Sequence, residues 1–178
     1  MTTATSTTTE TPAPTTDPER AVLLETLATR RAFLLETVEG LDDEQASRRP
    51  TVSALNLAGI VKHVALVEER WLSFVLSGPE AFEDDLATRA DEFDLLPGET
   101  LVGVLAYYEA VARRTERIVT EEVASLDDTH LLPARPWFQP GAYRSARGVL
   151  VHLIGETAQH SGHADILRET IDGRRTMG

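Results

Sequence analysis

The sequence predicts an all-α protein, a four-helix bundle with one long crossover between its second and third helices. Three observations support this prediction. Apolar residues recur at steps of three and four, the period of a helix with one buried face, in four stretches: 17–40, 56–76, 99–123 and 145–173. The chain has no convincing strand pattern and no internal repeat. Long helices without strands bury their apolar faces against one another.

The N-terminal residues 1–16 differ in composition from the rest of the chain. They are rich in threonine, include Pro12 and Pro14, and contain no large apolar residue after Met1. Such a segment cannot bury enough surface to offset the entropy lost on ordering. We therefore expect a disordered tail at 1–16, followed by one domain over residues 17–178.

The first helix is predicted to begin at Asp17 and Pro18. Aspartate is a good helix cap, and proline is tolerated in the first turn. Apolar spacing then continues to Gly40, where a polar connector follows. A short helical turn is possible after Asp42, before Pro50 interrupts the connector.

The second predicted helix covers residues 56–76 and ends at a Ser-Gly-Pro sequence. The acidic segment 80–98 has no long helical pattern, and a connection of that length can cross a whole bundle. The third predicted helix covers 99–123. Residues 124–144, which contain three prolines, are expected to form a loop.

The last predicted helix, 145–173, carries the candidate chemistry. Ser145 is a suitable N-cap, and Gly173 is a suitable C-terminal stop. His160 lies near the middle of the apolar stripe, and Glu156 lies about 40° to one side. Because side chains at i and i+4 lean the same way along a helix, Glu156 and His160 can share one metal ion.

A catalytic zinc ion usually needs a third protein ligand. The chain offers five histidines and no cysteine. His63 is the leading candidate, although it flanks the apolar stripe of the second predicted helix. Two histidines and one carboxylate would leave zinc an open position, which is typical of catalytic rather than structural sites.

These residues also have structural interpretations. A histidine at the edge of an apolar stripe, such as His63, is more often packed or hydrogen-bonded than a metal ligand. A carboxylate near a core needs a partner, and Arg70 could supply it for Glu156. His163 would take the place of His160 if the last helix were rotated.

Weaker candidates for substrate binding lie around the start of the last helix. Arg144 and Arg147 could bind an anionic substrate or a thiol cofactor, although arginines at helix ends are commonly solvated. Trp137 and Phe138 are expected to anchor their loop. Alternatively, these two side chains form part of the wall at the mouth of the pocket. His163 is a further weak candidate for substrate contact.

The net charge and the amino-acid composition exclude several classes of partner and location. A formal net charge of −12 and a pI near 4.8 repel phosphate backbones, so we expect no nucleic-acid partner. Without cysteine there is no disulfide and no protein thiolate, which favours a reducing compartment. No apolar run is long enough for a membrane span, and the N-terminus lacks a signal-like pattern. We expect a cytoplasmic protein with a small-molecule substrate.

Two stretches resemble the DinB-like superfamily: LNLAGIVKHVALVEERWL (55–72) and VHLIGETAQHSGHADILRETIDG (151–173). The nearest branch includes the mycothiol-dependent maleylpyruvate isomerase N-terminal domain and the mini-circle protein type. In the wider superfamily a histidine of the second helix joins a His-x-x-x-His pair. In this branch a glutamate replaces the first member of the pair, and His63, Glu156 and His160 match that pattern.

The resemblance extends over essentially the whole chain after the tail. It implies a four-helix bundle with a long link between helices two and three, bound zinc or nickel, and a homodimer. It also implies a divalent-metal-dependent transferase that activates a low-molecular-weight thiol, mycothiol, toward a small electrophile. Relatives often have an aromatic residue after the arginine where this chain has Gly148 after Arg147. We expect no second domain after the bundle, so the isomerase reaction itself is not carried over.

Two other functions would use the same three ligands. One is metal-dependent hydrolysis, in which activated water replaces the thiol. The other is a non-catalytic metal-binding or small-molecule-binding module, of the kind found in stress responses. The sequence alone does not separate these functions from thiol transfer.

Overall fold

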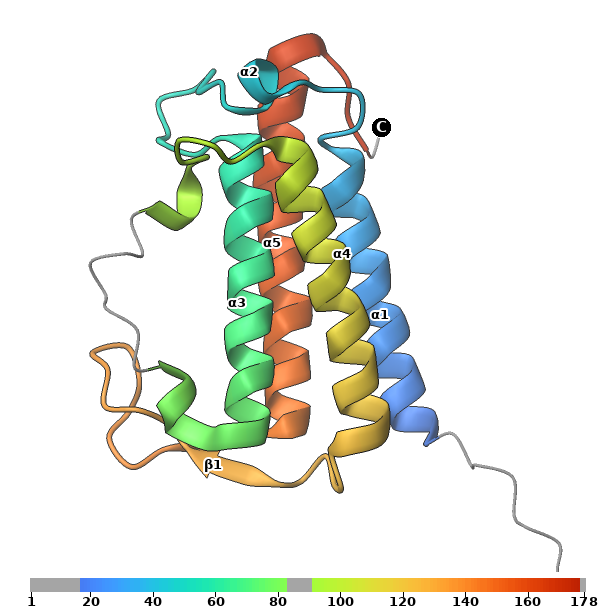
Figure 1. Ribbon diagram of the computed structural model, residues 1–178, viewed down its shortest axis with the longest axis vertical. Helices are drawn as coiled ribbons and strands as arrows, with labels where there is room; N and C mark the ends of the chain where they lie inside the picture. The colour runs from blue at the N-terminus through green and yellow to red at the C-terminus, as the bar shows by residue number, and fades with distance from the viewer. Residues whose placement is uncertain (1–16, 83–90, 177–178) are drawn as a thin grey trace, which may run out of the picture.

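The computed structural model describes residues 17–82 and 91–176. Four long helices lie side by side along the long axis of the molecule (Figure 1): α1 (Pro18–Glu36), α3 (Leu57–Ser77), α4 (Leu101–Arg117) and α5 (Ala146–Asp172). The predicted all-α class is confirmed. The expected tail at 1–16 lies outside the described residues. Within those residues, none of the helices is long and apolar enough to cross a membrane.

Shorter elements join these helices: α2 (Asp43–Ala46), the 3₁₀ helix η1 (Gly78–Phe82), the π-helical η3 (Ile118–Glu122) that continues α4, β1 (Thr129–Leu131) and β2 (Tyr143–Ser145). The two strands pair antiparallel, with Thr129 opposite Ser145. The sequence shows no convincing strand pattern here, and the two strands lie within and at the end of the expected loop 124–144. Strands of three residues are too short to show a recognisable alternation.

α3 and α4 run in the same direction (Figure 1), so the chain returns along the molecule between them. This arrangement agrees with the predicted crossover, although residues 83–90 of that connection lie outside the described residues. α3 packs against both α4 and α5, and α1 packs against α5. The α3–α5 contact brings together the two helices that carry the candidate ligands.

Side-chain caps begin the long helices, and those at Asp17 and Ser145 are the caps predicted from the sequence. Each capping oxygen accepts a hydrogen bond from a backbone N–H of the first turn, as follows: Asp17 from Glu19, Asn56 from Gly59, Thr100 from Gly103 and Ser145 from Gly148. Gly78 and Gly173 follow α3 and α5 with φ of 76° and 80°, a region that favours glycine. The first helix ends at Glu36, four residues earlier than predicted.

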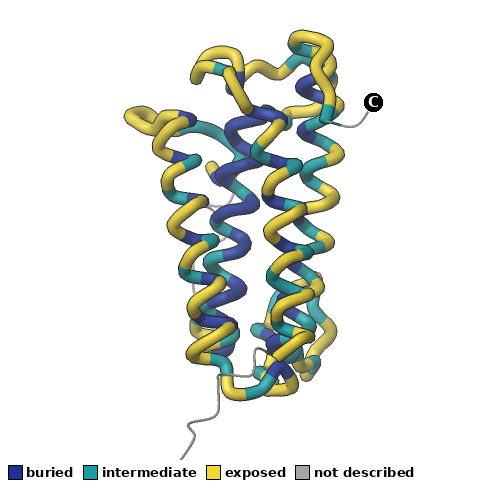
Figure 2. Tube along the Cα trace, turned by 90° about the vertical axis from the view of Figure 1, so that its right-hand side faces the viewer, coloured by how far each residue is buried: buried dark blue, intermediate teal, exposed yellow. Residues whose placement is uncertain are grey.

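Buried residues line the inner faces of the helices (Figure 2), and they form two apolar clusters. The core is also crossed by an ion pair between Arg31 of α1 and Glu68 of α3, which is 1% exposed. Nε of Arg31 donates to Glu68 at 2.9 Å, and the hydroxyl of Thr115 in α4 donates to the same carboxylate. Because an unpaired buried charge costs about 3–5 kcal/mol, this pair holds three helices in one arrangement.

The segment 91–94 docks on the first turns of α3. A Cβ at Gly59 would lie 1.8 Å from the carbonyl oxygen of Phe93, so only glycine permits this approach. Nδ2 of Asn56 donates to the same carbonyl at 3.0 Å. Nζ of Lys62 donates to two further carbonyls of the segment, at 3.0 and 3.2 Å. This short segment, which is 3₁₀-helical over residues 91–93, is thereby held firmly against one face of α3.

Replacement of Gly59 tests this docking. We expect Gly59→Ala to lower the free energy of unfolding by about 1–3 kcal/mol, because the new methyl group displaces the segment 91–94. Urea denaturation measures the change. The control is Gly155→Ala, at an exposed helical glycine where an added Cβ would meet no described atom within 4 Å beyond the local helix backbone. This substitution should raise stability by about 0.5–1 kcal/mol. Equal stability of Gly59→Ala and the wild type would contradict the docking.

Candidate metal centre

Three side chains converge where α3 packs against α5. One donor atom from each of His63, Glu156 and His160 lies within 4.8 Å of the other two. Oε1 of Glu156 is 3.5 Å from Nε2 of His63 and 3.4 Å from Nε2 of His160. Donors bound at about 2.1 Å around one tetrahedral ion would stand roughly 3.4 Å apart. The two separations from Glu156 match this value, and all three donors lie close enough together to share a single divalent cation.

The charges at the centre favour an ionised carboxylate. Hydrogen bonds with His160 and then His63 hold the pKa of Glu156 far below its usual value. Burial opposes protonation of His63, but hydrogen bonds to Glu156 and Glu92 outweigh it and raise the pKa of His63. The three side chains are 12–24% exposed, so the donors are partly desolvated and still reachable from outside.

Glu92 supports His63 from the side away from Glu156. Its Oε2 accepts from Nδ1 of His63 at 3.1 Å, and its Oε1 pairs with Arg70. Since an ionised carboxylate can only accept, Nδ1 of His63 donates a proton to Glu92, and Nε2 is the nitrogen that faces Glu156. The ring of Phe93 stacks on the imidazole with centroids 4.1 Å apart, which also limits rotation of His63.

The sequence did not single out Glu92, because it lies in an acidic segment without periodicity. Arg70, which the sequence offered as an alternative partner of Glu156, pairs with Glu92 instead. Glu92 is only 7% exposed, and burial of that carboxylate follows from the docking of 91–94 on α3. Hydrogen bonds from His63 and Arg70 outweigh the effect of burial and lower the pKa of Glu92.

His163 lies beside the centre rather than in it. Its ring meets that of His160 edge-on, with centroids 5.4 Å apart, and it is not one of the three converging donors. Nδ1 of His163 is buried without a hydrogen-bond partner among the described residues. The rotation of α5 therefore places His160, and not His163, next to Glu156.

A cavity of about 320 Å³ opens next to the centre, and His63 and Glu156 line it. Aromatic rings form much of its wall: Trp71, Phe82, Phe93, Trp137 and Phe138. Arg144 and His152 also reach the cavity. Two of the weaker candidates, Trp137 and Arg144, thus lie near the centre, and Trp137 stands in the wall while remaining 54% exposed.

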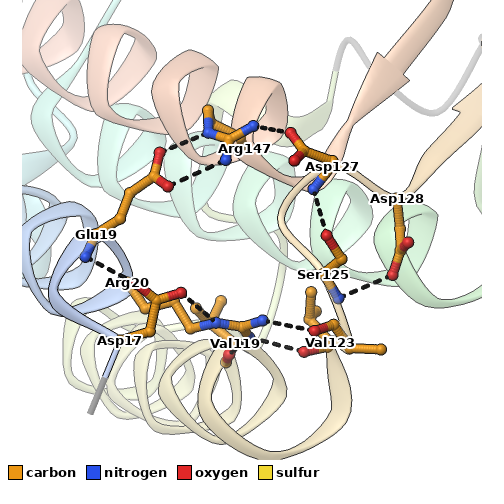
Figure 3. A network of polar contacts seen from close by, with 10 residues as sticks. Asp17, Glu19, Arg20, Val119, Val123, Ser125, Asp127, Asp128 and Arg147 are labelled. Carbon is orange, nitrogen blue, oxygen red and sulfur yellow. Dashed lines mark hydrogen bonds and ion pairs between the residues drawn. The ribbon is translucent and has the colours of Figure 1, made fainter. Parts of the chain in front are cut away.

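Arg147 is placed elsewhere. Its guanidinium binds Glu19 through Nε at 2.5 Å and Nη2 at 3.0 Å, and it also pairs with Asp127 (Figure 3). Nearby, Arg20 donates to the carbonyl of Val123 at 2.7 Å. These contacts tie the start of α1 to the start of α5, and Arg147 does not line the cavity. The expectation of substrate binding by Arg147 finds no support in this position.

A family model described as Mycothiol-S-transferase matches residues 22–173. The chain belongs to the mycothiol-S-transferase family. The match includes all three converging residues, and this family is of the DinB-like type, so the resemblance seen in the sequence is confirmed.

Known structures support the same fold for this mycothiol-S-transferase family member. It is similar to a solved structure described as a conserved protein from Enterococcus faecalis, with a TM-score of 0.63 and 19% identity. The similarity covers 86% of this chain and 97% of that chain. At this identity the comparison shows the fold alone. A comparison with curated proteins gives no significant match.

Proposed function

We propose that this protein is a divalent-metal-dependent transferase that conjugates mycothiol to a small electrophile. His63, Glu156 and His160 are proposed as the metal ligands. The observation that carries the proposal is the convergence of these three donors in a chain that matches the mycothiol-S-transferase family. Two imidazole nitrogens and one carboxylate oxygen suit zinc best, and nickel is the next candidate.

We also propose that residues 17–178 form one domain, since the same long helices build both apolar clusters.

When bound, such a cation would supply a thiolate near neutral pH, since its charge stabilises the deprotonated sulfur. No protein thiol competes, because the chain has no cysteine. In the overall transfer the sulfur bonds to the electrophilic carbon, the thiol proton passes to solvent, and the leaving group departs with the electron pair of its broken bond.

The residues around the three donors fix the orientation of His63 and form the wall of the neighbouring cavity. Glu92 keeps Nε2 of His63 directed at Glu156, and Arg70 keeps Glu92 ionised. A carboxylate behind a ligating histidine commonly fixes its ring orientation and raises its basicity. The aromatic wall beside the centre excludes water and accepts the apolar part of an electrophile.

The ligand assignment predicts metal content. We expect purified His160→Ala to contain no bound metal and His63→Ala to bind it far more weakly than the wild type, because each loses one of three donors. Elemental analysis after dialysis measures the metal-to-protein ratio. The matched control is His163→Ala, one turn further along α5, which should retain full occupancy. Full metal content in both His160→Ala and His63→Ala would refute the assignment.

The supporting role of Glu92 predicts a smaller effect. We expect Glu92→Gln to weaken metal binding about 10- to 100-fold, because Nδ1 of His63 loses its charged acceptor. Competition with a chromophoric zinc chelator measures the dissociation constant. Glu109→Gln, at an exposed carboxylate paired with Arg113, is the control and should leave the constant unchanged. Unchanged affinity in Glu92→Gln would remove Glu92 from the site.

Turnover distinguishes thiol transfer from the other two functions. With 1-chloro-2,4-dinitrobenzene as electrophile, we expect conjugate formation that requires mycothiol, stops on chelation and returns when zinc is restored. Absorbance of the thioether measures the rate. An equal rate of electrophile loss without mycothiol would instead indicate a hydrolase. Stoichiometric metal with no thiol-dependent rate across several electrophiles would indicate a binding module.

A further inference from the structure

The guanidinium of Arg144 occupies the cavity beside the candidate metal centre. Arg144 belongs to β2, and its Cζ lies 4.6 Å from the centroid of the Trp71 ring and 5.9 Å from that of Phe138. Contact with two aromatic rings limits the motion of the guanidinium. The cavity that Arg144 lines is the one that His63 and Glu156 also line.

One nitrogen of this guanidinium is buried without an acceptor. Nη1 of Arg144 has no hydrogen-bond partner among the described residues. By contrast, the buried Arg31 and Arg168 face the carboxylates of Glu68 and Asp172. Burial lowers the pKa of Arg144, but an arginine stays charged at physiological pH. A buried polar group without a hydrogen bond costs about 1–3 kcal/mol, so a ligand that supplies an acceptor to this N–H would be bound more tightly.

The carboxylates that line the cavity are already engaged. Glu92 accepts from His63 and pairs with Arg70, and Glu156 lies between two imidazoles. Burial, and then the positive charge of Arg144, lower the pKa of His152, which also interacts electrostatically with Glu156. His152 is therefore an uncharged neighbour. Among the residues that the structure describes, none accepts from Nη1 of Arg144, so this N–H is available to an acceptor on a ligand.

We propose that Arg144 binds a carboxylate of the electrophile, and that the cavity selects flat, unsaturated or aromatic carboxylic acids. A guanidinium matches a carboxylate with two parallel hydrogen bonds. The surrounding rings favour stacking of a planar body, and a volume of about 320 Å³ suits a small molecule. Mycothiol is an uncharged sugar thiol, so the anion belongs to the second substrate. The proposal rests on the proposed function, because it names the substrate class for that same site.

The test compares two electrophiles that differ in one charge, 4-chloro-3-nitrobenzoate and its methyl ester. In both, the thiol sulfur bonds to the carbon that carries chlorine, the C–Cl bond breaks, chloride leaves with the electron pair, and the thiol proton passes to solvent. Each kcat/KM is divided by the rate constant of the uncatalysed reaction with mycothiol. We expect the wild-type enzyme to prefer the acid over the ester about 10-fold or more after this correction.

Two substitutions and one control assign the preference to a residue. We expect Arg144→Met to abolish the preference, chiefly by raising KM for the acid, while KM for mycothiol and the metal content stay unchanged. Arg144→Lys should restore part of the preference, because it keeps the charge without the planar fork. The control Arg147→Met removes a guanidinium outside the cavity and should keep the full preference. A wild-type enzyme without preference for the acid, or an unchanged preference in Arg144→Met, would overturn the proposal.

Binding to metal-free protein separates this proposal from the proposed function. Saturation-transfer NMR gives the dissociation constants of 3-nitrobenzoate and 3-nitrobenzamide, neither of which reacts with a thiol. We expect the wild type to bind the acid about 10-fold more tightly than the amide, and Arg144→Met to bind both equally. This result without any turnover would contradict thiol transfer and leave the carboxylate site standing. Equal binding of acid and amide by the wild type would contradict the carboxylate site alone.

Discussion

The carboxylate of Glu156, held between the imidazoles of His63 and His160, is the interaction on which the proposed chemistry depends. It joins α3 to α5, and it is the only one of the three converging donors that carries a fixed negative charge. The carboxylate oxygen lies 3.4–3.5 Å from one nitrogen of each imidazole, and a partly buried carboxylate is costly without positive charge close to it. The same arrangement suits a divalent cation, so the packing of two helices and the chemistry of the site reinforce each other.

The short segment 91–94 completes the centre from outside the four long helices. Gly59 allows the backbone at Phe93 to approach α3, and Asn56 and Lys62 bind that backbone. The result is that Glu92 reaches Nδ1 of His63 and fixes which nitrogen faces the centre. The beginning of α3 therefore has two roles, since it starts a helix and also provides the docking surface for a supporting carboxylate.

Local rules accounted for much of this structure and for the pair Glu156 and His160, whereas His63 was indicated mainly by the family resemblance. Caps and apolar periodicity predicted the long helices, and the i, i+4 spacing of Glu156 and His160 placed both on one face. The position of Glu92 could not be predicted, because it follows from tertiary docking of a segment without a period. Arg144 and Arg147 looked equivalent in the sequence, yet a strand directs one into the cavity while the first turn of a helix directs the other toward Glu19.

Anomalous diffraction from crystals grown with zinc tests the central claim most directly. The account predicts one strong peak, bounded by Nε2 of His63, Nε2 of His160 and a carboxylate oxygen of Glu156 at about 2.0–2.2 Å. Nδ1 of His63 should remain within hydrogen-bonding distance of Glu92. A peak at His163 or His152 in place of His160, or no peak between α3 and α5 at full zinc loading, would contradict the account.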